Sequence, residues 1–211
     1  MPISIIDKGA DVLRNPYEPN VYGVGFMGEG IHKSKINGKT TREYHAWHSM
    51  MDRCYNSKHS ERYPTYAECE VCEAWHNFQT FAAWYDDNYY EIEGQRMCLD
   101  KDILEKGNKV YGPDTCVYAP NYINSLFVKS DATRGDFPIG VTRIAENKYV
   151  SRLDVRGKRR HLGYYETPEE AFFAYKSYKE RYIKQVADEY KDLIPQRLYD
   201  AMYEYEVEYE D

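Results

Sequence analysis

The sequence contains no apolar run of the length that a membrane-spanning helix needs, and it does not begin with a basic segment followed by an apolar one. A spanning helix requires about 18 or more consecutive apolar residues, and a secretory leader requires a charged start before its apolar stretch. We therefore expect no membrane partner and no export, which places the protein in a cytoplasm.

Cysteine is scarce and does not form the pattern of a disulfide-rich domain. The chain has five cysteines, an odd number that favours a reducing compartment. Cys69 and Cys72 form one CxxC motif, but a zinc site built from such motifs normally has two, and the second is missing. The pattern favours buried thiols. The alternative is a structural zinc that takes its ligands from the full set, Cys54, Cys69, Cys72, Cys98 and Cys116.

An overall excess of positive charge is also lacking, since the formal net charge is −7. The charge is unevenly distributed, however. Residues 188–211 carry nine acidic and two basic side chains, and residues 134–164 carry eight basic side chains against three acidic ones. A basic central segment beside an acidic end is typical of a protein with an acidic partner such as nucleic acid. The alternative is an ordinary solvated surface.

The first half of the chain is predicted to consist of turns followed by helices. Glycines 23, 25 and 28 match GxGxxG by letters, but no helix or βαβ unit is predicted to follow, so a dinucleotide site is not expected. Thr40 and Glu43 have the spacing of a capping box and predict a helix start. Aromatic residues then recur at helical spacing around Trp47 and between Trp75 and Tyr85, and we expect them to pack in a core.

Residues 138–190 are predicted to form three short strands and a helix. The strands are expected over 139–143, 148–155 and 158–164. A threonine cap at 167, a proline at 168 and a glutamate at 170 predict the helix start, and the apolar face of this helix must be buried on the sheet. The opposite face of the sheet would then carry four basic side chains: Arg152, Arg156, Arg159 and His161. Such a face can enter a major groove.

The C-terminal end alternates tyrosine or valine with glutamate from Tyr203 to Glu210. This period of two is typical of a strand. The segment is predicted to pair with an edge strand or to compete with DNA for the basic face, and the alternative is a frayed acidic end.

Residues 98–124 resemble the core of an HNH nuclease, in which two strands, a loop and a helix hold a divalent metal. The resemblance implies that Asp100 and Asn124 are the metal ligands, with Mg²⁺ as the ion, and that Asn108 is the loop residue that orients the base. Lys101 stands where the family has its catalytic histidine. A lysine is protonated at neutral pH, and it suits phosphate binding better than proton abstraction.

The C-terminal segment is similar to the plant ethylene-response-factor (Apetala-type) DNA-binding domain. The similarity lies in four motifs: Gly140-Val141, Lys148-Tyr149-Val150, His161-Leu162-Gly163-Tyr164-Tyr165 and Thr167-Pro168-Glu169-Glu170-Ala171. It implies DNA contacts from basic side chains of the sheet: Arg143, Arg152, Arg156, Arg159 and His161. Homing-type HNH proteins of phages often carry this module, and the chain resembles that family in further motifs: Tyr22-Gly23-Val24-Gly25, Trp47 with Arg53-Cys54-Tyr55, Val71-Cys72 with Trp75, and Leu99-Asp100-Lys101-Asp102.

We therefore predict an α+β protein. Residues 1–127 are predicted to form an HNH-like domain with an N-terminal extension, and its ββα-metal core has flanking helices. Residues 128–137 form a linker, 138–190 an ethylene-response-factor-like DNA-binding domain with a three-stranded antiparallel sheet packed on one helix, and 191–211 an acidic Tyr-rich tail. His45, on a flanking helix, is the fallback for the missing base. The predicted function is that of a phage-type protein of HNH homing-endonuclease lineage in the host cytoplasm. It binds double-stranded DNA, and its metal-dependent nicking is weakened or lost. The alternative is a non-catalytic phage accessory protein that binds and inhibits a host protein through the tail.

Overall fold

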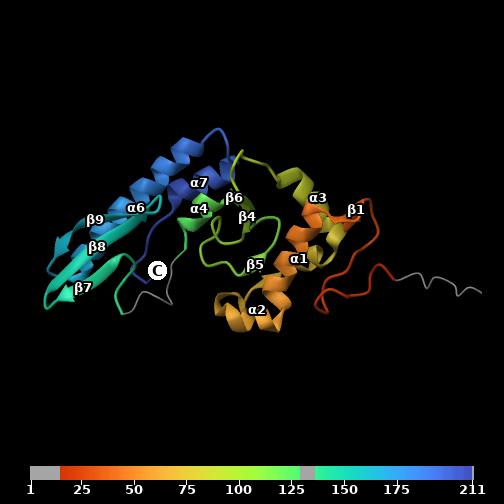
Figure 1. The fold of residues 1–211 in the computed structure, drawn as a ribbon, viewed down its shortest axis with the longest axis horizontal. Coiled ribbons are helices and arrows are strands. Elements are labelled where there is room, and N and C mark those ends of the chain that lie inside the picture. Colours follow the sequence, from red (N-terminus) through yellow and green to blue (C-terminus); the bar gives the residue numbers. More distant parts are fainter. Residues whose placement is uncertain (1–14, 129–135, 211) are drawn as a thin grey trace, which may run out of the picture. The chain divides into compact units, whose positions relative to one another are not determined.

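The computed structural model describes residues 15–128 and 136–210, and within them the chain divides into two compact units of mixed helix and strand (Figure 1). Unit 1 comprises the described chain up to Tyr89 together with Lys109–Pro113, and unit 2 comprises Tyr90–Asn108 and the described chain from Asp114 onward. The predicted domain boundaries stay a prediction, and most of the predicted linker, residues 129–135, lies outside the described residues. No helix in the described ranges is both long and apolar enough to cross a membrane.

Over the residues that the structure describes, unit 1 is built from short helices, one hairpin and one pair of parallel strands. Its elements are β1 (Lys35–Ile36), β2 (Lys39–Thr40), α1 (Arg42–Tyr55), α2 (Ser57–Arg62), η1 (Pro64–Tyr66), β3 (Glu70–Val71), η2 (Glu73–His76), α3 (Phe78–Asn88) and β5 (Val110–Tyr111). Strands β1 and β2 pair antiparallel, and β3 pairs parallel with β5.

The aromatic stripes of unit 1 pack as a core, which confirms the prediction. Trp47, Trp75 and Phe81 are at most 1% exposed, and the Trp47 indole N–H donates to the Trp75 carbonyl at 2.7 Å. The predicted capping box at Thr40 is wrong, because α1 begins one residue later than it requires. Its N-cap, Thr41, donates its hydroxyl to the Lys33 carbonyl instead of capping the helix.

The described residues of unit 2 form an antiparallel strand pair, a three-stranded antiparallel sheet and three helices. Its elements are β4 (Met97–Asp100), β6 (Val117–Pro120), α4 (Asn121–Ser125), β7 (Val141–Ala145), β8 (Lys148–Val155), β9 (Lys158–Tyr165), α6 (Pro168–Tyr190) and α7 (Gln196–Glu204). Strands β4 and β6 pair antiparallel, and the sheet has the order β7-β8-β9. The predicted three-stranded antiparallel sheet is therefore confirmed.

Strand β7 begins two residues later than predicted because the chain first turns at Gly140. This residue has a φ of +77°, and an added Cβ would lie 1.9 Å from the Tyr175 ring. Only glycine satisfies both constraints, and the close approach lets the start of β7 lie against α6.

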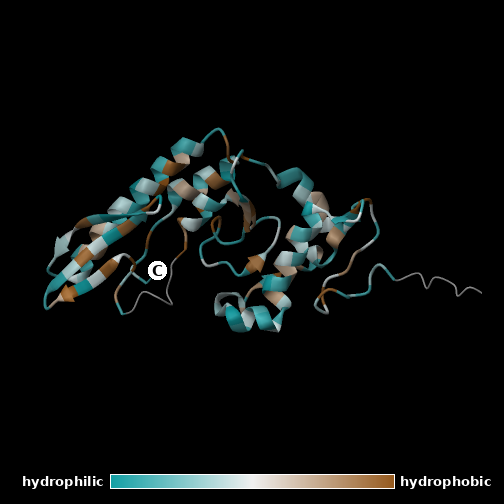
Figure 2. Cartoon of the chain, in the orientation of Figure 1, coloured by the Kyte–Doolittle hydropathy of each residue, from teal (hydrophilic) through white to brown (hydrophobic). Residues whose placement is uncertain are grey.

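Helix α6 begins where the sequence predicts it to begin. The Thr167 side chain accepts from the Glu170 backbone N–H at 3.2 Å, and Pro168 occupies the first turn. The face that carries Ala171 and Tyr175 is buried in a cluster that includes Leu153 of the sheet, as predicted. Polar and apolar positions alternate along the helix (Figure 2).

The acidic C-terminal segment is not a strand, and that prediction is wrong. Residues 196–204 form α7, in which Leu198 and Met202 are fully buried. Beyond α7, Val207 is 3% exposed. Its carbonyl accepts from the Lys176 ammonium at 2.7 Å and its N–H donates to Glu180 at 2.8 Å. Apolar residues four apart on a helix share one face, and burial of that face decides the conformation. The host-protein alternative stays a prediction.

One lysine interrupts the buried face of α6 and gives a pH-dependent prediction. Lys179 is 8% exposed, and burial lowers its pKa to about 8. Below pH 8 the charged side chain must be buried on folding. As pH rises from about 8 toward the ordinary lysine value, the folded state loses this proton before the unfolded state does, so stability increases.

We expect Lys179→Met to raise the free energy of unfolding at pH 7 by on the order of 3 kcal/mol, which corresponds to the lowered pKa. Methionine keeps an unbranched side chain in the same place. The gain should shrink between pH 8 and 10 in urea unfolding. Lys184→Met, at an exposed position of α6, is the control. If the gain does not change with pH, or if the control gains as much, burial of the Lys179 ammonium is not the cause of the effect.

Candidate functional site

The loop that follows β4 is shaped by the carboxylate of Asp100. Its Oδ1 atom accepts from the backbone N–H groups of Asp102 and Ile103, both at 2.8 Å. Burial, and then repulsion from the Asp102 carboxylate, raise the pKa of Asp100 to about 6. Two carboxylates so close together favour a cation between or beside them.

Lys101 supplies one cation to this loop. The side chain is 8% exposed, and its ammonium lies 3.2 Å from Asp102 Oδ2. The backbone of the same residue is held by Asn108, whose amide N–H₂ donates to the Lys101 carbonyl at 2.6 Å. The structure therefore brings Asn108 to the main chain at position 101, whose side chain is an ammonium group.

Asn124 lies on α4, the short helix that directly follows β6. Its side-chain oxygen is buried and has no hydrogen-bond partner among the described residues. A buried amide oxygen without a donor is costly, and amide and carboxylate oxygens are the ligands that hard divalent cations prefer. The donor chemistry of Asp100 and Asn124 thus fits Mg²⁺, although the Lys101 ammonium would compete with the ion.

The described residues contain no cluster of the usual metal-binding side chains. No group of three or more His, Cys, Asp and Glu side chains in residues 15–128 and 136–210 is arranged to hold a metal ion. All five cysteines are thiols rather than disulfides. Cys69 donates to the Thr65 carbonyl and Cys98 to the Asn121 side chain. The zinc alternative therefore has no ligand cluster among the described residues.

His45, the fallback base, lies on an exposed position of α1 in unit 1, whereas Asp100, Lys101, Asn108 and Asn124 belong to unit 2. The role of His45 as a base stays a prediction.

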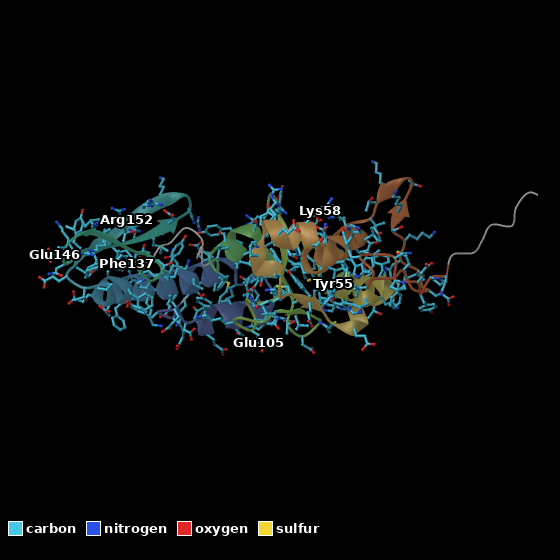
Figure 3. The ribbon with its side chains drawn as sticks, turned by 90° about the horizontal axis from the view of Figure 1, so that it is seen from below. Tyr55, Lys58, Glu105, Phe137, Glu146 and Arg152 are labelled. Carbon is cyan, nitrogen blue, oxygen red and sulfur yellow. The ribbon has the colours of Figure 1, made fainter. Side chains whose placement is uncertain are left out.

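The face of the sheet opposite α6, which we call the outer face, is defined by the strand register. Tyr149, Leu153 and Val155 pack in the cluster under α6. Alternation along β8 therefore places Arg152 and Asp154 on the outer face. Their partners on β9 share that face: His161 lies opposite Arg152, and Arg159 lies opposite Asp154. Figure 3 labels Arg152 on this sheet.

The outer face also carries Lys148 and Tyr164, which belong to the quoted motifs but were not predicted to contact DNA. Tyr164 is 58% exposed, and its ring lies 4.5 Å from that of His161. The Lys148 ammonium lies 5.1 Å from the centre of the Tyr164 ring. An exposed aromatic ring between two nitrogen-containing side chains suits stacking on a base or a sugar. Lys148 and Arg152 lie four residues apart in the same predicted strand. Residues at even spacing share a face of a sheet, so this spacing could have indicated that Lys148 lies on the outer face.

Arg156 is not on the outer face, so this part of the prediction is wrong. It sits in the β8–β9 turn with a φ of +49°, and its guanidinium pairs with Glu189 near the end of α6. It also lies 5.5 Å from the centre of the Tyr122 ring. The left-handed turn directs the side chain toward the helix, where an intramolecular carboxylate satisfies it.

Arg143 and Arg159 also differ in surroundings. Arg143 lies opposite Tyr149, which assigns it to the α6 side of the edge strand, and its Nε donates to the Ala145 carbonyl. Arg159 lies 3.3 Å from Asp154, with more than 60% of both side chains exposed. Exposed pairs of this kind contribute little, so Arg159 can exchange its partner for a phosphate.

Unit 1 contains a polar network that sequence reasoning missed. Asp52 accepts from the Tyr22 hydroxyl at 2.5 Å and from the Asn56 amide at 2.7 Å, and it lies 3.0 Å from His59 Nδ1. Hydrogen bonds from Asn56, Tyr22 and His59 hold the pKa of Asp52 below its usual value. Asn56 and His59 follow Asp52 within seven residues, whereas Tyr22 lies 30 residues before it and is brought to α1 only by the fold.

No family model, curated protein or solved structure matches the chain. The function must therefore be argued from the two arrangements in unit 2.

Proposed function

We propose that the protein binds double-stranded DNA through the outer face of its three-stranded sheet. The observation that carries the proposal is the grouping of Arg152, Arg159, His161, Lys148 and Tyr164 on the side of the sheet that α6 leaves uncovered. The resemblance to the ethylene-response-factor domain points to the same face.

The physical basis is a match of shape and charge. A major groove is about 12 Å wide and accepts a pair of strands, and arginine side chains suit phosphates and guanine edges. The Arg159 guanidinium contributes a phosphate contact once it leaves Asp154. His161 and Tyr164 supply contacts to sugars or bases beside it.

The same chain carries a metal-dependent nicking centre in weakened or lost form, in keeping with an HNH homing-endonuclease lineage of phage type. Asp100 and Asn124 would hold Mg²⁺, which when bound neutralises the scissile phosphate. Asn108 holds the backbone at position 101. Lys101 stands in place of the histidine that serves as base in that family, and its ammonium is paired with Asp102. It is suited to hold a phosphate oxygen instead.

The binding proposal predicts different effects for arginines on the two sides of one sheet. Arg152→Ala/Arg159→Ala should lower the affinity for a short duplex by about tenfold or more and reduce the salt slope by about two, because each lost phosphate contact removes roughly one unit. Fluorescence anisotropy with a labelled duplex of mixed sequence, between 50 and 200 mM salt, measures both.

The control removes the same charge from the other side. Arg156→Ala/Arg160→Ala changes two arginines that contact Glu189 and the Tyr178 ring, so most of the affinity and the slope should remain. If the two double variants lose the same affinity and slope, attraction by diffuse charge is enough and the outer face is not the binding surface. If neither variant differs from the parent, the binding proposal fails.

A further inference from the structure

The β1–β2 hairpin of unit 1 has no role in the core. Residues 35–40 are all exposed, and the hairpin projects from the helices of its unit (orange strands in Figure 3). Two-stranded hairpins are marginal alone. This one is held by its turn, Asn37 at φ +51° and Gly38 at φ +76°, a pair that suits the hairpin twist.

The base of the hairpin is fixed to the body by polar contacts. Gln79 on α3 accepts from the His32 N–H at 3.0 Å and donates to the His32 carbonyl at 2.9 Å. Thr41 donates its hydroxyl to the Lys33 carbonyl and its N–H to the Ser34 carbonyl. These bonds set the direction of the hairpin without burying any of its side chains at the tip.

The charge of the segment has one sign. Residues 30–42 include Lys33, Lys35, Lys39 and Arg42 and no acidic residue, in a chain that has 35 acidic residues. The ammonium groups of the three lysines make no hydrogen bond or ion pair within the described residues. Lysine on an exposed strand edge is a common protection against aggregation. The positive charge by itself is therefore not sufficient evidence of a binding role.

Two exposed isoleucines distinguish this hairpin from a merely protected edge. Ile36, beside the turn, is 57% exposed, and Ile31, before β1, is 86% exposed. Protection of an edge does not call for exposed β-branched apolar residues. Several DNA-binding proteins enter a groove with a basic arm that carries an apolar residue at its tip. The apolar side chain is inserted between neighbouring base pairs.

We propose that the β1–β2 hairpin is a second DNA-binding element, with Lys33, Lys35 and Lys39 on phosphates and Ile36 inserted between bases. It shares its partner with the proposed function but rests on residues of the other unit. A rigid direction, a single sign of charge and an exposed apolar tip all fit a duplex groove.

The test uses the full chain and a labelled 30-base-pair duplex. Lys33→Ala/Lys35→Ala/Lys39→Ala should weaken binding at least tenfold and lower the salt slope by about three, with unchanged melting temperature because the positions are exposed. Lys58→Ala/Arg62→Ala/Lys109→Ala removes the same charge elsewhere in unit 1 and should have a much smaller effect. Ile36→Ala should keep the slope and reduce duplex bending, followed by energy transfer between dyes at the two ends.

The outcomes are separable. Equal losses in the two triple variants, or parental affinity and slope in the hairpin variant, overturn the proposal. So does a hairpin variant that loses binding to vesicles with anionic lipid while keeping its DNA affinity, because the partner is then a membrane surface. If Arg152→Ala/Arg159→Ala has no effect while the hairpin variant does, the outer-face proposal fails and the hairpin proposal stands. If the hairpin variant has no effect while Arg152→Ala/Arg159→Ala does, only the hairpin proposal fails.

Discussion

Replacement of Lys101 by histidine is expected to raise metal-dependent nicking of supercoiled plasmid by about 100- to 10,000-fold, the usual contribution of a positioned base. The backbone at this position is already held by Asn108 through a 2.6 Å hydrogen bond, so the new imidazole would start from a fixed main chain. The substitution also removes the ammonium that lies 3.2 Å from Asp102. Less positive charge beside Asp100 should strengthen Mg²⁺ binding.

The two effects of this substitution can be separated. Lys101→Met removes the ammonium without adding a base, so it should bind Mg²⁺ more tightly than the parent and still fail to nick. Lys101→His should do both, and Asp100→Ala in the histidine background should lose both. Strong Mg²⁺-dependent cleavage by the unmodified protein that is unaffected by Lys101→Ala would show that the base lies elsewhere, and His45 would be the next residue to change.

Shortening Met202 to alanine is expected to destabilise unit 2 by about 2–5 kcal/mol, the usual cost of such a buried truncation. Met202 is fully buried on α7 in the cluster that contains Ile183 of α6. Urea unfolding of the full chain measures the loss. Glu204→Ala, at an exposed position of the same helix, should stay within about 0.5 kcal/mol of the parent. A loss below about 1 kcal/mol for Met202→Ala would mean that α7 is not an integral part of the unit.

This second prediction concerns a segment where local pattern and tertiary packing disagree. The alternation of tyrosine and glutamate from Tyr203 favours a strand when it is considered alone. It overlaps the end of a helix whose apolar positions, Leu198 and Met202, lie four residues apart. The helical arrangement buries both side chains against α6. The sequence of the tail does not indicate that α6 has an apolar surface on which Leu198 and Met202 can pack.

For the outer face, the local pattern predicted some positions correctly and tertiary structure decided another. Strand alternation predicted that Arg152, Arg159 and His161 share a side of the sheet, and the register agrees. The same reasoning failed for Arg156, since it extends the alternation into a turn. A φ of +49° redirects that side chain to Glu189, which lies 33 residues along the chain.

Local information in the sequence determined the three strands and the long helix of residues 138–190. Thr167 with Glu170 defines the start of α6, and the alternation along residues 148–155 defines β8, because capping and period are properties of neighbouring residues. The tertiary structure alone decided which groups meet across long separations. It brought Tyr22 to Asp52, left the oxygen of Asn124 without a partner among the described residues and fixed the β1–β2 hairpin through Gln79. Such contacts depend on packing between elements, which no short stretch of sequence encodes.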